Sequence, residues 1–221
     1  MVAKRTDDIS SFIVMDVLER ACEMESCGQD VVHLEVGEPD FDTPTCIKDA
    51  LCRAMDEGHT HYCHSLGLPE LRDAISRYYH DTYGVAVDPD GIIITPGTSP
   101  AMFLLFAALL EPDDEVIISD PHYACYPNFI KFVQGRVVTV PVYEEDGFQY
   151  RPEAIAARIT ERTRAVFINS PSNPTGNLLS ADRMKAISRL APAVVSDEIY
   201  HGLVYEGQEH SILEFTDRAF V

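Results

Sequence analysis

The chain has 221 residues, which is enough for one well-formed hydrophobic core or for one domain with part of a second. The net charge of −19 disfavours nucleic acid as a partner, because a negative surface repels the phosphate backbone. No apolar run approaches the roughly 20 residues of a membrane span. The N-terminus lacks the apolar stretch of a signal peptide. We therefore expect a cytoplasmic protein that binds neither nucleic acid nor membranes.

Histidines and a cysteine gather in one short segment that could suggest a metal site. They are His59, His61, Cys63 and His64, and their spacing matches no known zinc pattern. None of the six cysteines forms a C-x-x-C pair, so they are interpreted as reduced thiols. The segment is interpreted as a polar loop, and no metal site is predicted.

The first 90 residues or so are predicted to be helical and irregular. Helices are expected over residues 12–24, 44–58 and 69–84, with a short strand at 31–34. Pro44 and Pro69 are placed as first helical residues, where a proline costs no hydrogen bond.

From residue 91 on, short apolar runs rich in β-branched residues alternate with helical stretches. Strands are predicted at 92–95, 116–119, 137–140, 165–168 and 193–196, and helices at 100–110, 123–133, 152–158 and 181–190. This alternation predicts an α/β fold, a three-layer α/β/α arrangement with a mostly parallel sheet. Residues 205–221 contain no convincing element, so an apolar sheet edge is expected to stay open and prone to association.

In an open α/β sheet, ligands bind at the carboxyl ends of the strands. Gly97, Thr98 and Ser99 follow the 92–95 run, and with the free amides of a helix start they could hold a phosphate. The same residues also fit an ordinary helix start, with Ser99 as the cap and Pro100 as the first helical residue.

Three further strand ends carry groups that could face a flat ligand. Tyr123 could stack on a ring or simply pack on a helix face. Asn173 offers an amide on a loop stiffened by two prolines. Asp197 directly follows a buried run and needs a partner, which a protonated ring nitrogen would provide, while Tyr200 could donate to a ring oxygen. The set fits a planar, phosphorylated, nitrogen-containing ring.

Five motifs, in order and spacing, resemble the class I/II aminotransferases, which are pyridoxal-phosphate enzymes of fold type I. They are Leu34-Glu35-Val36-Gly37-Glu38-Pro39-Asp40-Phe41, His61-Tyr62 leading into Gly67-Leu68-Pro69-Glu70-Leu71-Arg72, Thr95-Pro96-Gly97-Thr98-Ser99, Ser170-Pro171-Ser172-Asn173-Pro174-Thr175-Gly176 and Ser196-Asp197-Glu198-Ile199-Tyr200. The resemblance implies an N-terminal arm on the substrate side over residues 1–45. It also implies a pyridoxal-phosphate-binding large domain, incomplete at its C-terminus, over 46–221.

The resemblance also implies roles for single residues. Gly37 would approach the substrate carboxylate, and Tyr62 would reach the cofactor phosphate of a neighbouring subunit, which implies a homodimer. The remaining roles belong to the cofactor: Gly97, Thr98 and Ser99 would hold its phosphate, Tyr123 would stack on its ring, Asn173 and Tyr200 would bond its phenolic oxygen, and Asp197 would pair with its pyridine nitrogen. Asp197 and Tyr200 are also the expected catalytic groups.

The family carries a Schiff-base lysine after the S-D-E-I-Y motif, and this chain has no lysine after Lys185. Lys131 and Lys185 are expected on surface helices. We therefore expect an N-terminal portion of an enzyme that transfers an amino group between an amino acid and a 2-oxo acid, inactive by itself. Two alternatives stay open: a non-catalytic module that binds pyridoxal phosphate or a degenerate relative of the family, and a pyridoxal-phosphate lyase or decarboxylase on the same scaffold.

Overall fold

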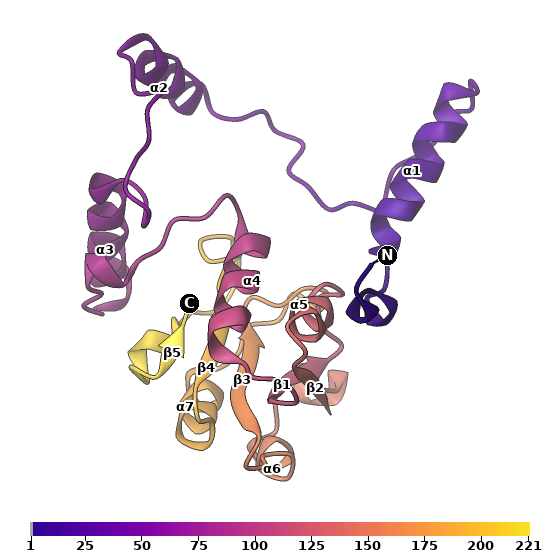
Figure 1. Cartoon of the computed structure of the whole chain (residues 1–221), viewed down its shortest axis with the longest axis vertical. Coiled ribbons are helices and arrows are strands. Elements are labelled where there is room, and N and C mark those ends of the chain that lie inside the picture. Colours follow the sequence, from indigo (N-terminus) through magenta and orange to yellow (C-terminus); the bar gives the residue numbers. More distant parts are fainter. Residues whose placement is uncertain (1) are drawn as a thin grey trace.

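A five-stranded parallel sheet forms the centre of the structure, a computed structural model that describes residues 2–221 (Figure 1). Its order is β2-β1-β3-β4-β5. The strands are β1 (Glu115–Asp120), β2 (Arg136–Pro141), β3 (Thr163–Asn169), β4 (Val194–Asp197) and β5 (Ala219–Phe220). Every neighbouring pair is parallel, which confirms the predicted fold class.

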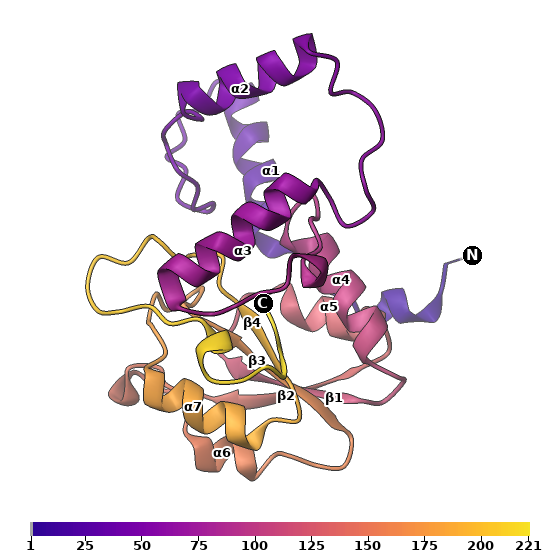
Figure 2. The same ribbon diagram turned by 90° about the vertical axis from the view of Figure 1, so that its left-hand side faces the viewer.

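Apolar side chains alternate between the two faces of the sheet and build two cores. On β1, Val116 and Ile118 face α4 (Thr98–Leu109) and α5 (Tyr126–Phe132). Ile117 faces the opposite way, toward α6 (Pro152–Ala156), α7 (Ala181–Leu190) and the short 3-10 helix η4 (Ile212–Glu214). Strands with both faces buried read as continuous apolar runs, which is why β1, β3 and β4 are predictable from the sequence. The edge strand β2 is mostly half-buried or exposed, and its β-branched residues make it predictable. Figures 1 and 2 show the resulting three layers.

The N-terminal elements lie outside the layers of the sheet, and long irregular segments join three of their helices (Figure 1). They are η1 (Lys4–Asp8), α1 (Ile13–Ser26), α2 (Thr45–Asp56), α3 (Pro69–Tyr83) and η2 (Pro89–Gly91). α2 buries no residue, and α1 buries only Ala21. α3 ends as predicted at Gly84, which adopts the left-handed conformation that glycine tolerates at a helix end.

Two predicted strands are wrong. Residues 31–34 and 92–95 form no strand, because neither run lies beside a strand with which it could share a hydrogen-bond ladder. Val32 and Leu34 are 80% and 89% exposed. In the second run, the Ile94 amide donates to the Leu66 carbonyl at 2.9 Å. The two segments can approach this closely because residue 67 is a glycine, and a side chain at that position would collide with Ile94.

Element ends also differ from the prediction. β5 lies within the stretch predicted to contain no element, and its two residues are too few to show a pattern. α2 begins at Thr45, with Pro44 as the preceding cap residue. α4 begins two residues early, at Thr98, and α5 begins three residues late, at Tyr126. The last two shifts decide which side chains face the ligand-binding edge.

Candidate functional site

The carboxylate of Asp197 lies at the end of β4, where it is held by two hydrogen bonds. Its Oδ2 accepts from the Tyr126 hydroxyl at 2.8 Å, and its Oδ1 accepts from the Ile199 amide at 3.1 Å. Asp197 follows Val195 by two residues, so it shares the face of the sheet that packs against α4 and α5. The side chain is half-buried, and its orientation is fixed from two sides.

Asn169 joins the segments that follow β3 and β4. The strand register sets Asn169 directly beside Asp197. The Asn169 amide donates to the Asp197 carbonyl at 2.9 Å, and its Oδ1 accepts from the Asn173 backbone at 2.7 Å. The Asn173 side-chain amide in turn donates to the Tyr200 hydroxyl at 3.3 Å. Asp197, Asn173 and Tyr200, all predicted site residues, are therefore brought together.

Aromatic rings line the α5 side of this cluster. Tyr123 contacts Tyr126 edge to face, with 5.3 Å between the ring centroids. Phe12 from the N-terminal arm also packs edge to face on Tyr123, with 5.6 Å between the ring centroids. Burial raises the pKa of Tyr123 to about 12. Burial and the adjacent Asp197 charge also raise the pKa of Tyr126 well above its usual range, so its phenol stays protonated and donates.

The N-terminal end of α4 offers amides at the same end of the sheet as the segments that follow β3 and β4 (Figures 1 and 2). Gly97 is the cap residue, with a φ of 101°, and no side chain caps the helix. The alternative with Ser99 as cap is therefore wrong, because Thr98 and Ser99 already lie in the first turn. All three residues are exposed, as an anion site at a helix start requires.

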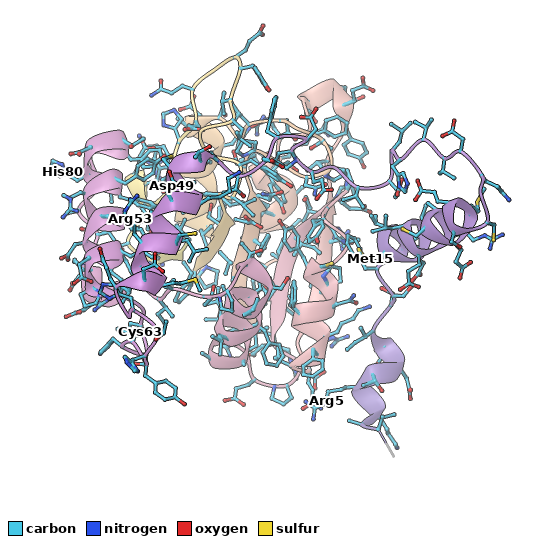
Figure 3. All side chains as sticks on the ribbon, turned by 90° about the horizontal axis from the view of Figure 1, so that it is seen from above. Arg5, Met15, Asp49, Arg53, Cys63 and His80 are labelled. Atoms are coloured by element: carbon cyan, nitrogen blue, oxygen red, sulfur yellow. The ribbon has the colours of Figure 1, made fainter. Side chains whose placement is uncertain are left out.

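Gly37 and Tyr62 are not brought to this cluster. Both lie on the exposed N-terminal segments, and the Tyr62 side chain is completely exposed, at 107%. Its neighbour Cys63 lies at the edge of the molecule in the view of Figure 3.

Sequence reasoning missed Tyr126 and Asn169. Asn169 had a usable signal, since it ends a strand beside the one that Asp197 ends. Tyr126 had no such signal. The residue at which α5 begins decides which tyrosine of the 123–126 stretch turns toward Asp197, and the sequence does not predict that residue.

Over residues 2–221, no three His, Cys, Asp or Glu side chains come together as metal ligands would. Within the same range, no helix combines the length and the apolar character needed to cross a bilayer.

Comparison with known proteins identifies the family. Residues 29–221 match the family described as aminotransferase class I and II, and the chain belongs to it. It is 42% identical to the (5-formylfuran-3-yl)methyl phosphate transaminase of Methanocaldococcus jannaschii, over 98% of this chain and 56% of the relative. It is 40% identical to the aspartate/prephenate aminotransferase of Thermus thermophilus, over 95% of this chain and 56% of that protein.

A solved structure shows the same architecture. The aspartate aminotransferase of Thermus thermophilus with maleate superimposes with a TM-score of 0.95 at 38% identity, covering 99% of this chain and 59% of the other. The chain thus spans little more than half the length of the relatives that it matches.

Aminotransferases of this family depend on pyridoxal phosphate. The donor set fits that cofactor: a carboxylate for a ring nitrogen, an amide and a phenol for a ring oxygen, and uncapped helix amides for a phosphate.

Proposed function

We propose that this chain forms the cofactor-binding part of an aminotransferase that moves an amino group between an amino acid and a 2-oxo acid. The proposal is carried by one observation, the carboxylate of Asp197 held at the carboxyl end of β4 beside the linked pair Asn173 and Tyr200. A negative group in that place suits a ring nitrogen that must stay protonated.

Each residue then has a defined task. When bound, pyridoxal phosphate supplies a conjugated ring that accepts an electron pair from the substrate carbon. Asp197 holds the proton on the pyridine nitrogen, and Tyr126 keeps the carboxylate aimed. Asn173 and Tyr200 donate to the phenolic oxygen. The first amides of α4, at Thr98 and Ser99, bind the phosphate, and Tyr123 packs against the ring.

The four lysines favour a second candidate for the chain by itself, a module that binds the cofactor without a covalent bond. They are Lys4, Lys48, Lys131 and Lys185. All four are exposed, on η1, α2, α5 and α7 respectively, and not on the segments that follow β3 and β4. Borohydride reduction in the presence of pyridoxal phosphate separates the two candidates: stoichiometric fixation at one lysine would contradict the non-covalent module.

We also propose that the partner is a second copy of the chain, with Tyr62 of one copy reaching the phosphate site of the other. The complete exposure of this tyrosine and the partial exposure of apolar residues on α2 support the proposal. Gly37 is proposed to approach the substrate carboxylate, for which the exposed 27–44 segment leaves room.

The function is tested by titrating the chain with pyridoxamine 5′-phosphate, which lacks the aldehyde and so cannot react with surface lysines. Asp197→Ala should weaken binding by about 10- to 100-fold, the cost of losing a charged hydrogen bond. Asp182→Ala, on the exposed first turn of α7, is the matched control and should bind like the wild type. Equal affinities for all three proteins would remove Asp197 from the cofactor site.

A further inference from the structure

A buried polar cluster lies directly behind the candidate site, on the opposite face of the sheet. Glu198 follows Asp197 in the chain but points the other way, and its side chain is only 4% exposed. Its Oε1 accepts three hydrogen bonds, which come from the Ser196 hydroxyl at 2.8 Å, the Ile212 amide at 2.9 Å and the Ser211 hydroxyl at 3.3 Å. The carboxylate therefore ties the end of β4 to η4.

The other carboxylate oxygen faces a histidine. Glu198 Oε2 lies 3.6 Å from Nδ1 of His201, whose side chain is 8% exposed. That distance is too long for a hydrogen bond, so the imidazole does not pair with this oxygen of the carboxylate. Within residues 2–221, Glu198 Oε2 and His201 Nε2 have no hydrogen-bond partner, so neither side chain is held as fully as its burial demands.

Helix α3 closes the cluster. The hydroxyl of Tyr83, its last residue, lies 2.6 Å from His201 Nδ1, and the two rings pack with 5.5 Å between centroids. Burial raises the pKa of Tyr83, so the phenol keeps its hydrogen and can donate it to the imidazole. Tyr83 thereby connects an N-terminal helix to the turn that carries both cofactor-facing groups of β4.

We infer that Tyr83, His201 and Glu198 form a clasp that positions Asp197 and Tyr200 for the cofactor ring. The two cofactor-facing residues lie on the same five-residue turn as the clasp residues Glu198 and His201, and a shift of the turn moves all four. The three clasp residues are positioning residues, since they touch the ring-facing groups only through the backbone. The inference rests on the proposed function.

The test compares a ring ligand with a phosphate ligand. The clasp supports the ring-facing groups at the end of β4 and leaves the phosphate amides of α4 alone. Tyr83→Phe keeps the ring and removes only the hydroxyl. It should weaken pyridoxamine 5′-phosphate about fivefold, the loss of one hydrogen bond, while inorganic phosphate binds as before. Glu198→Gln should act in the same direction, and fully exposed Tyr205→Phe should change neither affinity.

Two results would overturn the inference: an equal loss for both ligands, as expected of a merely structural residue, or no loss for either. If the wild type does not bind pyridoxamine 5′-phosphate, the proposed function fails. Amide hydrogen exchange measured without ligand then tests whether the clasp holds the turn. Tyr83→Phe should speed amide exchange over residues 198–203, and Tyr205→Phe should not. Unchanged exchange in Tyr83→Phe would rule the clasp out.

Discussion

Tyr126 is the residue that keeps the Asp197 carboxylate aimed at the carboxyl edge of the sheet. The tyrosine is itself buried against Phe167, with 4.2 Å between ring centroids, so its hydroxyl has little freedom to turn away. A donor fixed by packing orients its acceptor without further loss of side-chain entropy. The proposed task of Asp197 therefore depends on a residue that never touches the ring nitrogen.

Replacing Tyr126 by Phe tests this dependence. The variant keeps the packing and loses the donor, so we expect about 1 kcal/mol less stability and roughly fivefold weaker binding of pyridoxamine 5′-phosphate. Because the pKa of Tyr126 is raised, its phenol is protonated at all working pH values, and the affinity ratio of variant to wild type should be constant between about pH 6 and 9. Half-exposed Tyr143→Phe is the control, and a ratio that varies with pH would contradict the assigned donor.

At the scale of elements, an ion pair between a buried carboxylate and a half-exposed guanidinium joins neighbouring strands at the edge opposite the site. Asp114, just before β1, accepts from the Arg164 guanidinium of β3 at 2.8 Å and from the Glu111 amide at 2.9 Å. The Arg164 hydrogen bond holds the pKa of Asp114 below its ordinary value. A carboxylate with a lowered pKa stabilises the fold above its unfolded pKa, and this contribution is lost as the pH falls through the folded value.

Asp114→Asn should therefore lower the midpoint of thermal unfolding at pH 7. The gap between wild type and variant should close as the pH falls below about 4. Asp113→Asn is the matched control: its exposed side chain makes only a 4.0 Å contact with Arg162, and asparagine tolerates the positive φ at this position. A gap that persists at acid pH would mean that the Asp114 charge is not responsible.

How far the sequence predicts these elements depends on what each needs from its neighbours. Buried strands such as 165–168 can be predicted from the sequence, because both of their faces are apolar. The 92–95 run is even richer in β-branched residues, but such residues indicate a fit to a sheet and do not tell whether a partner strand lies beside them. The places of Asp197, which ends a strand, and of Asn173, on the loop after a strand, were predictable from topology. Tyr126 and His201 were not, because side-chain direction depends on where a helix or turn begins.

On the scale of the whole molecule, the apolar surface is concentrated on the N-terminal elements. On α2, Ile47, Leu51 and Met55 recur every four residues and are 56%, 62% and 59% exposed. Such a stripe on one helix face marks a surface that another element covers. Asp49 and Arg53, labelled in Figure 3, lie on the same helix between these positions.

The proposed pairing of two copies makes a prediction for this stripe. Leu51→Glu should reduce the mass in solution, measured by light scattering after size exclusion, from that of a dimer to that of a monomer. Burying one unpaired carboxylate costs more than the contact provides. Lys48→Gln changes the net charge by the same one unit on exposed α2 surface and should leave the mass unchanged. A wild-type chain that is monomeric at every concentration would contradict the pairing.

Asp197 is proposed to keep a bound pyridine nitrogen protonated. The direct measurement is the ¹⁵N chemical shift of pyridoxamine 5′-phosphate, labelled at the ring nitrogen and bound to the chain at about pH 8. We expect the shift of a protonated pyridinium in the wild type and that of an unprotonated ring in Asp197→Ala. An unprotonated ring bound to the wild type would contradict it.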